Sequence, residues 1–174
     1  MIRNALILTM PLALMACATV EQPPAGPVAQ AQLTLANGQG AGTAKVTGTG
    51  DHLTLEIAVS GVTAGAHGIH LHTVGRCDAP DFTTAGGHLN PHGKKHGADN
   101  PEGSHFGDLP NIEVGANGDG ALKIGLHGTR AEILAQLFDA DGTAVVLHAG
   151  PDDYKTDPAG NSGGRIACGV LTRG

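Results

Sequence analysis

The sequence predicts an all-β domain of eight short antiparallel strands, packed as a sandwich or flattened barrel with two long functional loops. The chain of 174 residues carries 28 glycines, no tryptophan and only 2% aromatic residues. Short runs of Val, Ile, Leu and Thr alternate with polar residues, and turn residues separate them. A helical bundle would carry more Leu, Glu and Lys and far less Gly.

The first 16 residues are expected to form a signal peptide. Arg3 supplies a positive start, and the apolar stretch at residues 5–16 is too short to cross a bilayer, which takes about 20 residues. Residues 14–17 (LMAC) resemble the lipobox of bacterial lipoproteins, in which the cysteine is acylated, so lipidation of Cys17 is predicted. Ordinary cleavage after Ala18 is the alternative. Either route places the protein in the bacterial periplasm or cell envelope.

Residues 17–30 are expected to be the lipidated cysteine and a Pro- and Ala-rich tether, and residues 31–174 one domain. At ~3.1 Å per residue, such a tether reaches roughly 40 Å from a membrane. The lipid is then the only membrane contact. The sequence leaves the oligomeric state open, a homodimer included.

Three cysteines are an odd number, and a lipid on Cys17 leaves Cys77 and Cys168 as a pair. Export permits a disulfide between them. Closing a loop of about 90 residues stabilises a fold by up to ~4.5 kcal/mol in the chain-entropy model. Two unrelated buried thiols are the alternative.

Strand signals follow one another from residue 31. The alternation is clearest at residues 53–59, where four apolar side chains share one face. The NGDG run at residues 117–120 predicts a hairpin turn. Thr129 and Glu132 have the spacing of a capping box, so a short helix is expected near residues 130–137. The predicted strands cover residues 31–36, 43–48, 52–59, 66–72, 111–115, 120–126, 143–148 and 165–171.

Two segments interrupt this rhythm: residues 73–110 and 149–164, which are 38 and 16 residues long. Loops of this length in a compact domain are usually functional or disordered. Four histidines, Cys77 and several aspartates lie in the first loop. A bound metal would order a segment of this composition where core packing is absent, so order is the favoured interpretation.

Seven of the ten histidines lie within residues 67–105. On a strand His70 and His72 point to the same face, so both can bind one metal while their neighbours enter the core. His105 and Asp108 are separated by one turn, which lets two ligands converge. Further candidates are His88 and His96 in the long loop, and His148 at the end of a late strand.

Five strings in this order and spacing give the chain a specific resemblance to the copper/zinc superoxide dismutases, over about residues 31–172. They are GAHGIHLH at 65–72, AGGHLNPHGKKHG at 85–97, HFGDLPN at 105–111, LHAGPDDY at 147–154 and GNSGGRIACGV at 160–170. The resemblance implies a Greek-key β-sandwich and two bound metals, copper and zinc.

The resemblance also implies a role for each matching residue. His88 corresponds to the imidazolate that bridges both metals, and it carries the proton of the reaction. Arg165 corresponds to the catalytic arginine beside the copper, and Asp152 to the aspartate that joins a copper ligand to a zinc ligand. The implied copper ligands are His70, His72, His88 and His148; the implied zinc ligands are His88, His96, His105 and Asp108. The disulfide of the family corresponds to Cys77 and Cys168.

The remaining histidines have simpler interpretations. His67 corresponds to a structural histidine of the family, and His52, His92 and His127 are expected to be exposed or hydrogen-bonded. Independently of the resemblance, three histidines and one carboxylate suit a closed zinc site, and an all-imidazole set suits copper.

The implied reaction converts two superoxide anions and two protons to O₂ and H₂O₂ by Cu(II)/Cu(I) cycling. A non-catalytic copper or zinc buffer or delivery module on the same fold is the alternative, and a zinc hydrolase lacks an evident open zinc position. Without residues 1–16 the chain has 9 basic and 16 acidic residues, a net charge of −7, which argues against nucleic acid as a partner. Local positive charge must therefore attract the anion; Arg165 is the main candidate, and Lys94 and Lys95 are weaker ones.

Overall fold

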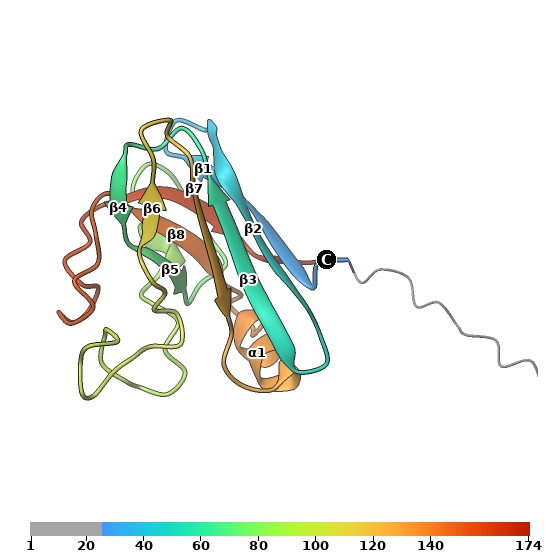
Figure 1. Cartoon of the computed structure of the whole chain (residues 1–174). Helices are drawn as coiled ribbons and strands as arrows, with labels where there is room; N and C mark the ends of the chain where they lie inside the picture. The colour runs from blue at the N-terminus through green and yellow to red at the C-terminus, as the bar shows by residue number, and fades with distance from the viewer. Residues whose placement is uncertain (1–25) are drawn as a thin grey trace, which may run out of the picture.

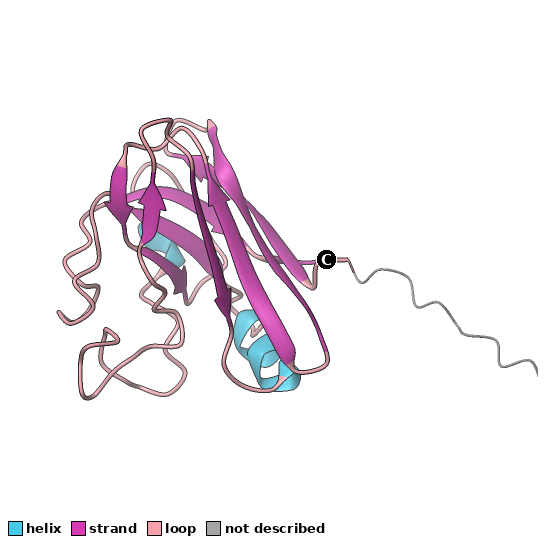
Figure 2. Cartoon of the chain, in the orientation of Figure 1, coloured by secondary structure: helices cyan, strands magenta, loops and turns pink. Residues whose placement is uncertain are grey.

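The computed structural model describes residues 26–174 (Figure 1). The predicted signal peptide and the predicted lipid on Cys17 lie outside these residues. Within residues 26–174 no helix is long and apolar enough to cross a membrane. In this described part of the chain, strands make up most of the regular structure, together with one α-helix and one short 3-10 helix (Figure 2). The predicted all-β class is confirmed.

The strands follow the predicted order along the chain. The first strand begins two residues earlier than expected, inside the segment assigned to the tether. A short strand at the C-terminus, which the sequence did not predict, pairs with it. The strands are β1 (Ala29–Leu35), β2 (Gly40–Thr49), β3 (His52–Val59), β4 (Gly65–His67), β5 (Ile69–His72), β6 (Ile112–Val114), β7 (Gly120–Gly125), β8 (Ala144–His148), β9 (Arg165–Val170) and β10 (Thr172–Arg173).

All paired strands are antiparallel, in the order β4-β6-β7-β3-β2-β1-β9-β8-β5. The two ends of this sheet, β4 and β5, are the halves of one predicted strand, residues 66–72, and they are separated only by Gly68. The sheet therefore curls into a nearly closed, flattened barrel. The pairs β3·β7, β1·β9 and β5·β8 join strands distant in sequence, as Greek-key crossovers require.

Gly68 is where the strand changes partners, from β6 to β8. A side chain there would place its Cβ 2.9 Å from the Cβ of Ser162 and 3.2 Å from Cε1 of His70. Only glycine leaves room for the second long loop to approach the strand so closely. The break thus brings residues 149–164 next to the histidines of β5.

The alternating residues of β3 behave as predicted: Leu53, Leu55, Ile57 and Val59 are buried. The helix α1 spans Arg130–Leu137, at the predicted position. It begins with the predicted capping box, in which Thr129 accepts a hydrogen bond from the Glu132 backbone and the Glu132 carboxylate accepts one from the Thr129 backbone. Helix α1 lies at one end of the barrel (Figure 1).

The two long loops, which the structure describes in full, extend from the barrel and contain no strand. Their only regular element is a short 3-10 helix in the first loop, η1 (Thr83–Ala85). Both loops lie on the side that carries β4, β5 and β6 (Figure 1). Isolated bridges tie the first loop back to β5, between His70 and Asp108 and between His72 and His88. This arrangement brings the histidines of the strands and those of the loop together.

Candidate metal centre

Two paired strands present three of the predicted ligands. His70 and His72 lie on β5, and β5 pairs with β8, which ends at His148. The backbone N–H of His148 donates to the carbonyl oxygen of Gly68, which fixes the end of β8 beside the strand break. All three histidine side chains are buried. They project from the rigid part of the fold.

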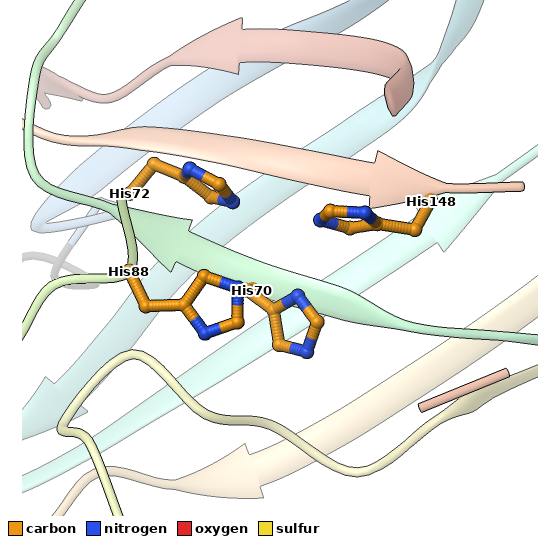
Figure 3. A group of neighbouring side chains, drawn as sticks. All are labelled: His70, His72, His88 and His148. Carbon is orange, nitrogen blue, oxygen red and sulfur yellow. The ribbon is translucent and has the colours of Figure 1, made fainter. Parts of the chain in front are cut away.

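The first long loop adds His88, whose side chain is 3% exposed. Its ring stacks on that of His70, with centroids 4.0 Å apart. Figure 3 shows the rings of His72 and His148 directed toward each other, with His70 and His88 beside them. One ring nitrogen from each of these residues lies within 4.8 Å of the others. We call His70, His72, His88 and His148 the four-histidine cluster.

In each ring of the four-histidine cluster, one nitrogen is occupied and the other has no partner. Nδ1 of His72 donates to Gly86 O at 2.9 Å, and Nδ1 of His148 donates to Gly163 O at 3.2 Å. The nitrogens left over are His70 Nδ1, His72 Nε2, His88 Nε2 and His148 Nε2, all buried and without a hydrogen-bond partner. A buried polar atom without a partner is costly. Four that converge on one point fit a metal ion.

Burial keeps three of these rings neutral, those of His72, His88 and His148. Loss of hydration lowers the pKa of His72 to about 2 and that of His88 to about 4. Burial, and next the nearby ring of His70, lower the pKa of His148 to about 3. A neutral imidazole that donates through one nitrogen leaves a lone pair on the other. At neutral pH the free nitrogens of these three rings can therefore bind a metal without first losing a proton.

A second cluster shares His88 with the first. Oδ1 of Asp108 lies 2.8 Å from Nδ1 of His88 and 3.0 Å from Nδ1 of both His96 and His105. A tetrahedral zinc site with bonds of about 2.0–2.1 Å has ligand–ligand edges of about 3.3 Å. The three distances from the Asp108 oxygen are therefore already close to those that zinc requires, and all four ligand atoms of this His–Asp cluster lie within 4.8 Å of one another.

The carboxylate of Asp108 is held in place by its other oxygen. Oδ2 accepts the backbone N–H groups of Gly97 and His105, at 2.8 and 2.9 Å. Burial alone would raise the pKa of Asp108, but the hydrogen bonds from His88 and Gly97 outweigh it and hold the pKa well below its ordinary range. The cluster thus combines three imidazoles with one ionised carboxylate.

Asp152 joins the two clusters. Its Oδ2 accepts Nε2–H of His70 at 2.7 Å, and its Oδ1 accepts Nε2–H of His96 at 3.0 Å. Both bonds leave Nδ1 of each ring free for the metal side. Outer carboxylates of this kind fix the tautomer and orientation of ligating histidines.

Three further residues surround Asp152, and none of them was predicted from the sequence. The Asn111 side chain donates to the Asp152 carbonyl at 2.9 Å and accepts the Asp152 N–H at 2.8 Å. The backbone N–H of Tyr154 donates to Oδ1 of Asp152 at 2.7 Å. Gly160 lies so close that a Cβ there would collide with Oδ1 of Asp152. Asn111, Tyr154 and Gly160 all fall inside the family-like strings at 105–111, 147–154 and 160–170, so the resemblance was the signal that could have found them.

Arg165 begins β9 opposite His148. Its guanidinium donates from Nη1 to Phe82 O at 2.7 Å and from Nη2 to Gly86 O at 2.6 Å. Burial lowers the pKa of Arg165 from its ordinary value, but a guanidinium stays charged in proteins. A half-buried cation therefore lies next to the four-histidine cluster.

The predicted disulfide between Cys77 and Cys168 is present, with Cα atoms 5.7 Å apart. It connects the start of the first long loop to β9. The ring of Phe82 packs beside it in a small apolar cluster, separate from the main core. That cluster contains Phe82, Ala85, Ala144, Val146 and Cys168, with Cys77 packed against it.

The other histidines lie outside both clusters. His67 is buried between two backbone carbonyls, those of His148 at 2.8 Å and Thr63 at 2.9 Å, as expected for a structural residue. The structure leaves three histidines on the surface: His52, His92 and His127. Lys94 and Lys95, the two lysines of the first long loop, are exposed, and Nζ of Lys95 lies 3.4 Å from the carboxylate of Asp157.

The fold and the site together define a β-barrel protein with two adjoining clusters of side chains that could hold metal ions. The family profile described as copper/zinc superoxide dismutase (SODC) matches residues 40–171. The chain belongs to this family.

Relatives support the same assignment. A Cu-Zn superoxide dismutase of Aquifex aeolicus (strain VF5) is 43% identical over 137 residues, which are 77% of this chain and 81% of that protein. A Cu-Zn superoxide dismutase of Caulobacter vibrioides is 39% identical over 149 residues, 82% of this chain and 84% of that protein. The crystal structure of a SOD-like protein from Bacillus subtilis superposes with a TM-score of 0.75 at 37% identity, covering 82% of this chain and 97% of that one.

Proposed function

We propose that this protein is a superoxide dismutase with copper in the four-histidine cluster and zinc in the His–Asp cluster. The observation that carries the proposal is the convergence of four unpartnered, buried imidazole nitrogens beside a cluster of three imidazoles and one carboxylate. One set consists of nitrogen donors alone, which suits a redox-active copper; the other has the composition of a closed zinc site.

Copper bound there supplies the one-electron couple that oxidises one superoxide anion and reduces the next. The residues around it have separate tasks. Arg165 attracts and orients the anion, because two backbone carbonyls hold the Arg165 guanidinium next to the four-histidine cluster. Asp152 holds the rings of His70 and His96 in the tautomer that ligation needs.

His88 is the residue placed to handle a proton. Its Nδ1 belongs to the His–Asp cluster and its Nε2 to the four-histidine cluster, so one ring serves both. With Nδ1 fixed on the zinc side, Nε2 is the atom that can take up a proton and release it to the reduced product.

A copper buffer or delivery module on the same fold is the second candidate, and the relatives include a protein named only as superoxide dismutase-like. A buffer has no need of a fixed cation beside its metal. The backbone clamp on Arg165 therefore favours the enzyme.

The deciding experiment is metal analysis of the purified protein, with superoxide decay followed before and after copper reconstitution. We expect equimolar copper and zinc, and His148→Ala should abolish dismutation while zinc is largely retained. His127→Ala, at an exposed position, is the matched control. Full activity in His148→Ala, or a native protein that holds zinc alone, contradicts the copper assignment.

Export and lipid attachment through Cys17 complete the proposal. The disulfide supports an oxidising compartment. Cys17→Ser should release active protein from membranes, and the intact mass of the mature N-terminus should show the acyl chains. A mature chain that starts at Thr19 without a lipid would mean ordinary signal cleavage. Light scattering of the released protein would show whether it forms a homodimer.

A further inference from the structure

The orientation of Arg165 depends on one short turn. Its two terminal nitrogens donate to the carbonyl oxygens of Phe82 and Gly86, at 2.7 and 2.6 Å. Both acceptors belong to the backbone of residues 82–86, which encloses η1. The turn therefore determines where the guanidinium lies, and a shift of this turn would move the cation away from the four-histidine cluster.

Phe82 has an unusual backbone conformation in this turn. Its φ is 54° and its ψ is 23°, in the left-handed region that bulky residues rarely adopt. The same carbonyl that faces Arg165 also accepts the N–H of Ala85 at 3.1 Å. The left-handed conformation thus sets the direction of the Phe82 carbonyl. A packing contact is needed to keep Phe82 in this conformation.

The ring of Phe82 provides that hold. It is 1% exposed, among the largest fully buried side chains within residues 26–174. It belongs to one apolar cluster with Cys168, Val146 and Ala144, so it is anchored beside β8, β9 and the disulfide. Such a ring cannot leave its site without opening the small apolar cluster.

We infer that Phe82 is a positioning residue for Arg165: burial of its ring beside the disulfide keeps the turn left-handed and aims the Phe82 carbonyl at the guanidinium. The inference rests on the proposed function, because that function gives Arg165 its task. The contact itself can be tested separately from catalysis.

The test compares variants of the mature protein loaded with zinc and with copper kept as Cu(I). Phe82→Gly removes the anchor but tolerates positive φ, whereas Phe82→Leu keeps an apolar anchor. Heteronuclear NMR reports hydrogen exchange of the Arg165 guanidinium protons. Exchange should be slow in the parent protein, at least about tenfold faster in Phe82→Gly, and close to the parent rate in Phe82→Leu, because buried hydrogen bonds protect against exchange. If Phe82→Gly does not fold, the exchange rate of the Arg165 guanidinium protons must rise from the parent to Phe82→Leu and again to Phe82→Val.

A second readout separates positioning from general damage. At full metal content and low salt, Phe82→Gly should lower kcat/KM by about fivefold to tenfold, within the range of electrostatic steering. In an Arg165→Lys background, which lacks the two-pronged contact, the same change should have little further effect. An equal loss in both backgrounds, or parent-like guanidinium exchange in Phe82→Gly, overturns the inference. Absence of dismutation in the fully metallated parent overturns the proposed function instead, while the exchange rates still decide the role of Phe82.

Discussion

The side chains of His72 and Arg165 donate to the same atom. The carbonyl oxygen of Gly86 accepts Nδ1–H of His72 at 2.9 Å and Nη2–H of Arg165 at 2.6 Å. One peptide group thus orients a ring of the four-histidine cluster and the cation beside it. Any movement of this turn changes the positions of both together.

Arg165 should dominate the capture of the anion. An acidic protein repels superoxide overall, and only local charge can offset this, because exposed charges beyond about 10 Å are screened at 0.1 M salt. Electrostatic steering is a known property of this enzyme family. Arg165→Glu should lower kcat/KM by at least ~10-fold at low ionic strength, within the known range for steering. The decrease in kcat/KM should be smaller for Arg165→Lys and smaller still for Lys94→Glu.

Pulse radiolysis from about 10 to 200 mM salt measures kcat/KM for these variants, because that interval covers the change from weak to strong screening. Copper content must be checked for each variant. An Arg165→Glu protein with full copper and an unchanged rate at the lowest salt would show that Arg165 does not guide the substrate.

Asp81 should act in the opposite direction. It is exposed and immediately precedes Phe82, whose carbonyl binds Arg165. Hydrogen bonds from the Thr83 backbone and hydroxyl lower the pKa of Asp81, so the carboxylate is ionised at neutral pH. Asp81→Asn should raise kcat/KM about twofold at low salt, because an anionic charge near the cation is removed.

Asp119→Asn, in the turn between β6 and β7, makes the same change in net charge at another place and is the control. An equal rise in both variants would show that overall charge matters and that the position of Asp81 does not.

Asp152 should control metal retention. In Asp152→Asn an amide N–H₂ replaces one of the two oxygens that accept from His70 and His96, so one ring loses its acceptor. Metal affinity should fall by about 10–100-fold, as for other outer carboxylates. Competition with a chelator measures the affinity for zinc and, in a separate titration, the affinity for copper. Asp119→Asn, which makes the same change in the distant turn between β6 and β7, should leave both affinities unchanged; similar losses in both variants would contradict the assignment.

Local patterns explain how much of this could be predicted from sequence. The alternation at residues 53–59 and the Thr129 capping box act over a few residues, so the strand and the helix were placed correctly. His70 and His72 share a strand face for the same reason. Residues whose role depends on contacts distant in sequence could not be predicted in this way. Gly68 lies at a strand break where Ser162 comes close to it, and the Phe82 carbonyl has a role because Arg165 donates to it.

The disulfide should stabilise the turn as well as the fold. It closes a loop of 91 residues in sequence and borders the cluster that buries Phe82. The double variant Cys77→Ala, Cys168→Ala should lower the free energy of unfolding by about 3 kcal/mol, typical for a native disulfide. Chemical denaturation measures it. Stability equal to the parent's, with metals retained, would show that the bond contributes little.

Acid should destabilise the metal-free protein over a defined pH range. Burial lowers the pKa values of His72, His88 and His148 to about 2, 4 and 3, whereas these rings titrate near pH 6.5 in the unfolded chain. Between pH 6.5 and about 4 the unfolded chain therefore binds up to three more protons than the folded one. Stability is complete above pH 6.5 and falls with decreasing pH, by up to about 1.4 kcal/mol per pH unit for each histidine.

Urea unfolding of the metal-free protein at a series of pH values tests this slope. The carboxyls of Asp108 and Asp152 have lowered pKa values too, but the unfolded value near 4 places their effect below this range. His72→Gln should reduce the slope by about one proton, or about 1.4 kcal/mol per pH unit. His127→Gln should leave it unchanged, because the His127 ring is exposed to solvent in the folded protein. A slope that is the same in the parent and in His72→Gln would mean that the His72 ring binds its proton in the folded state.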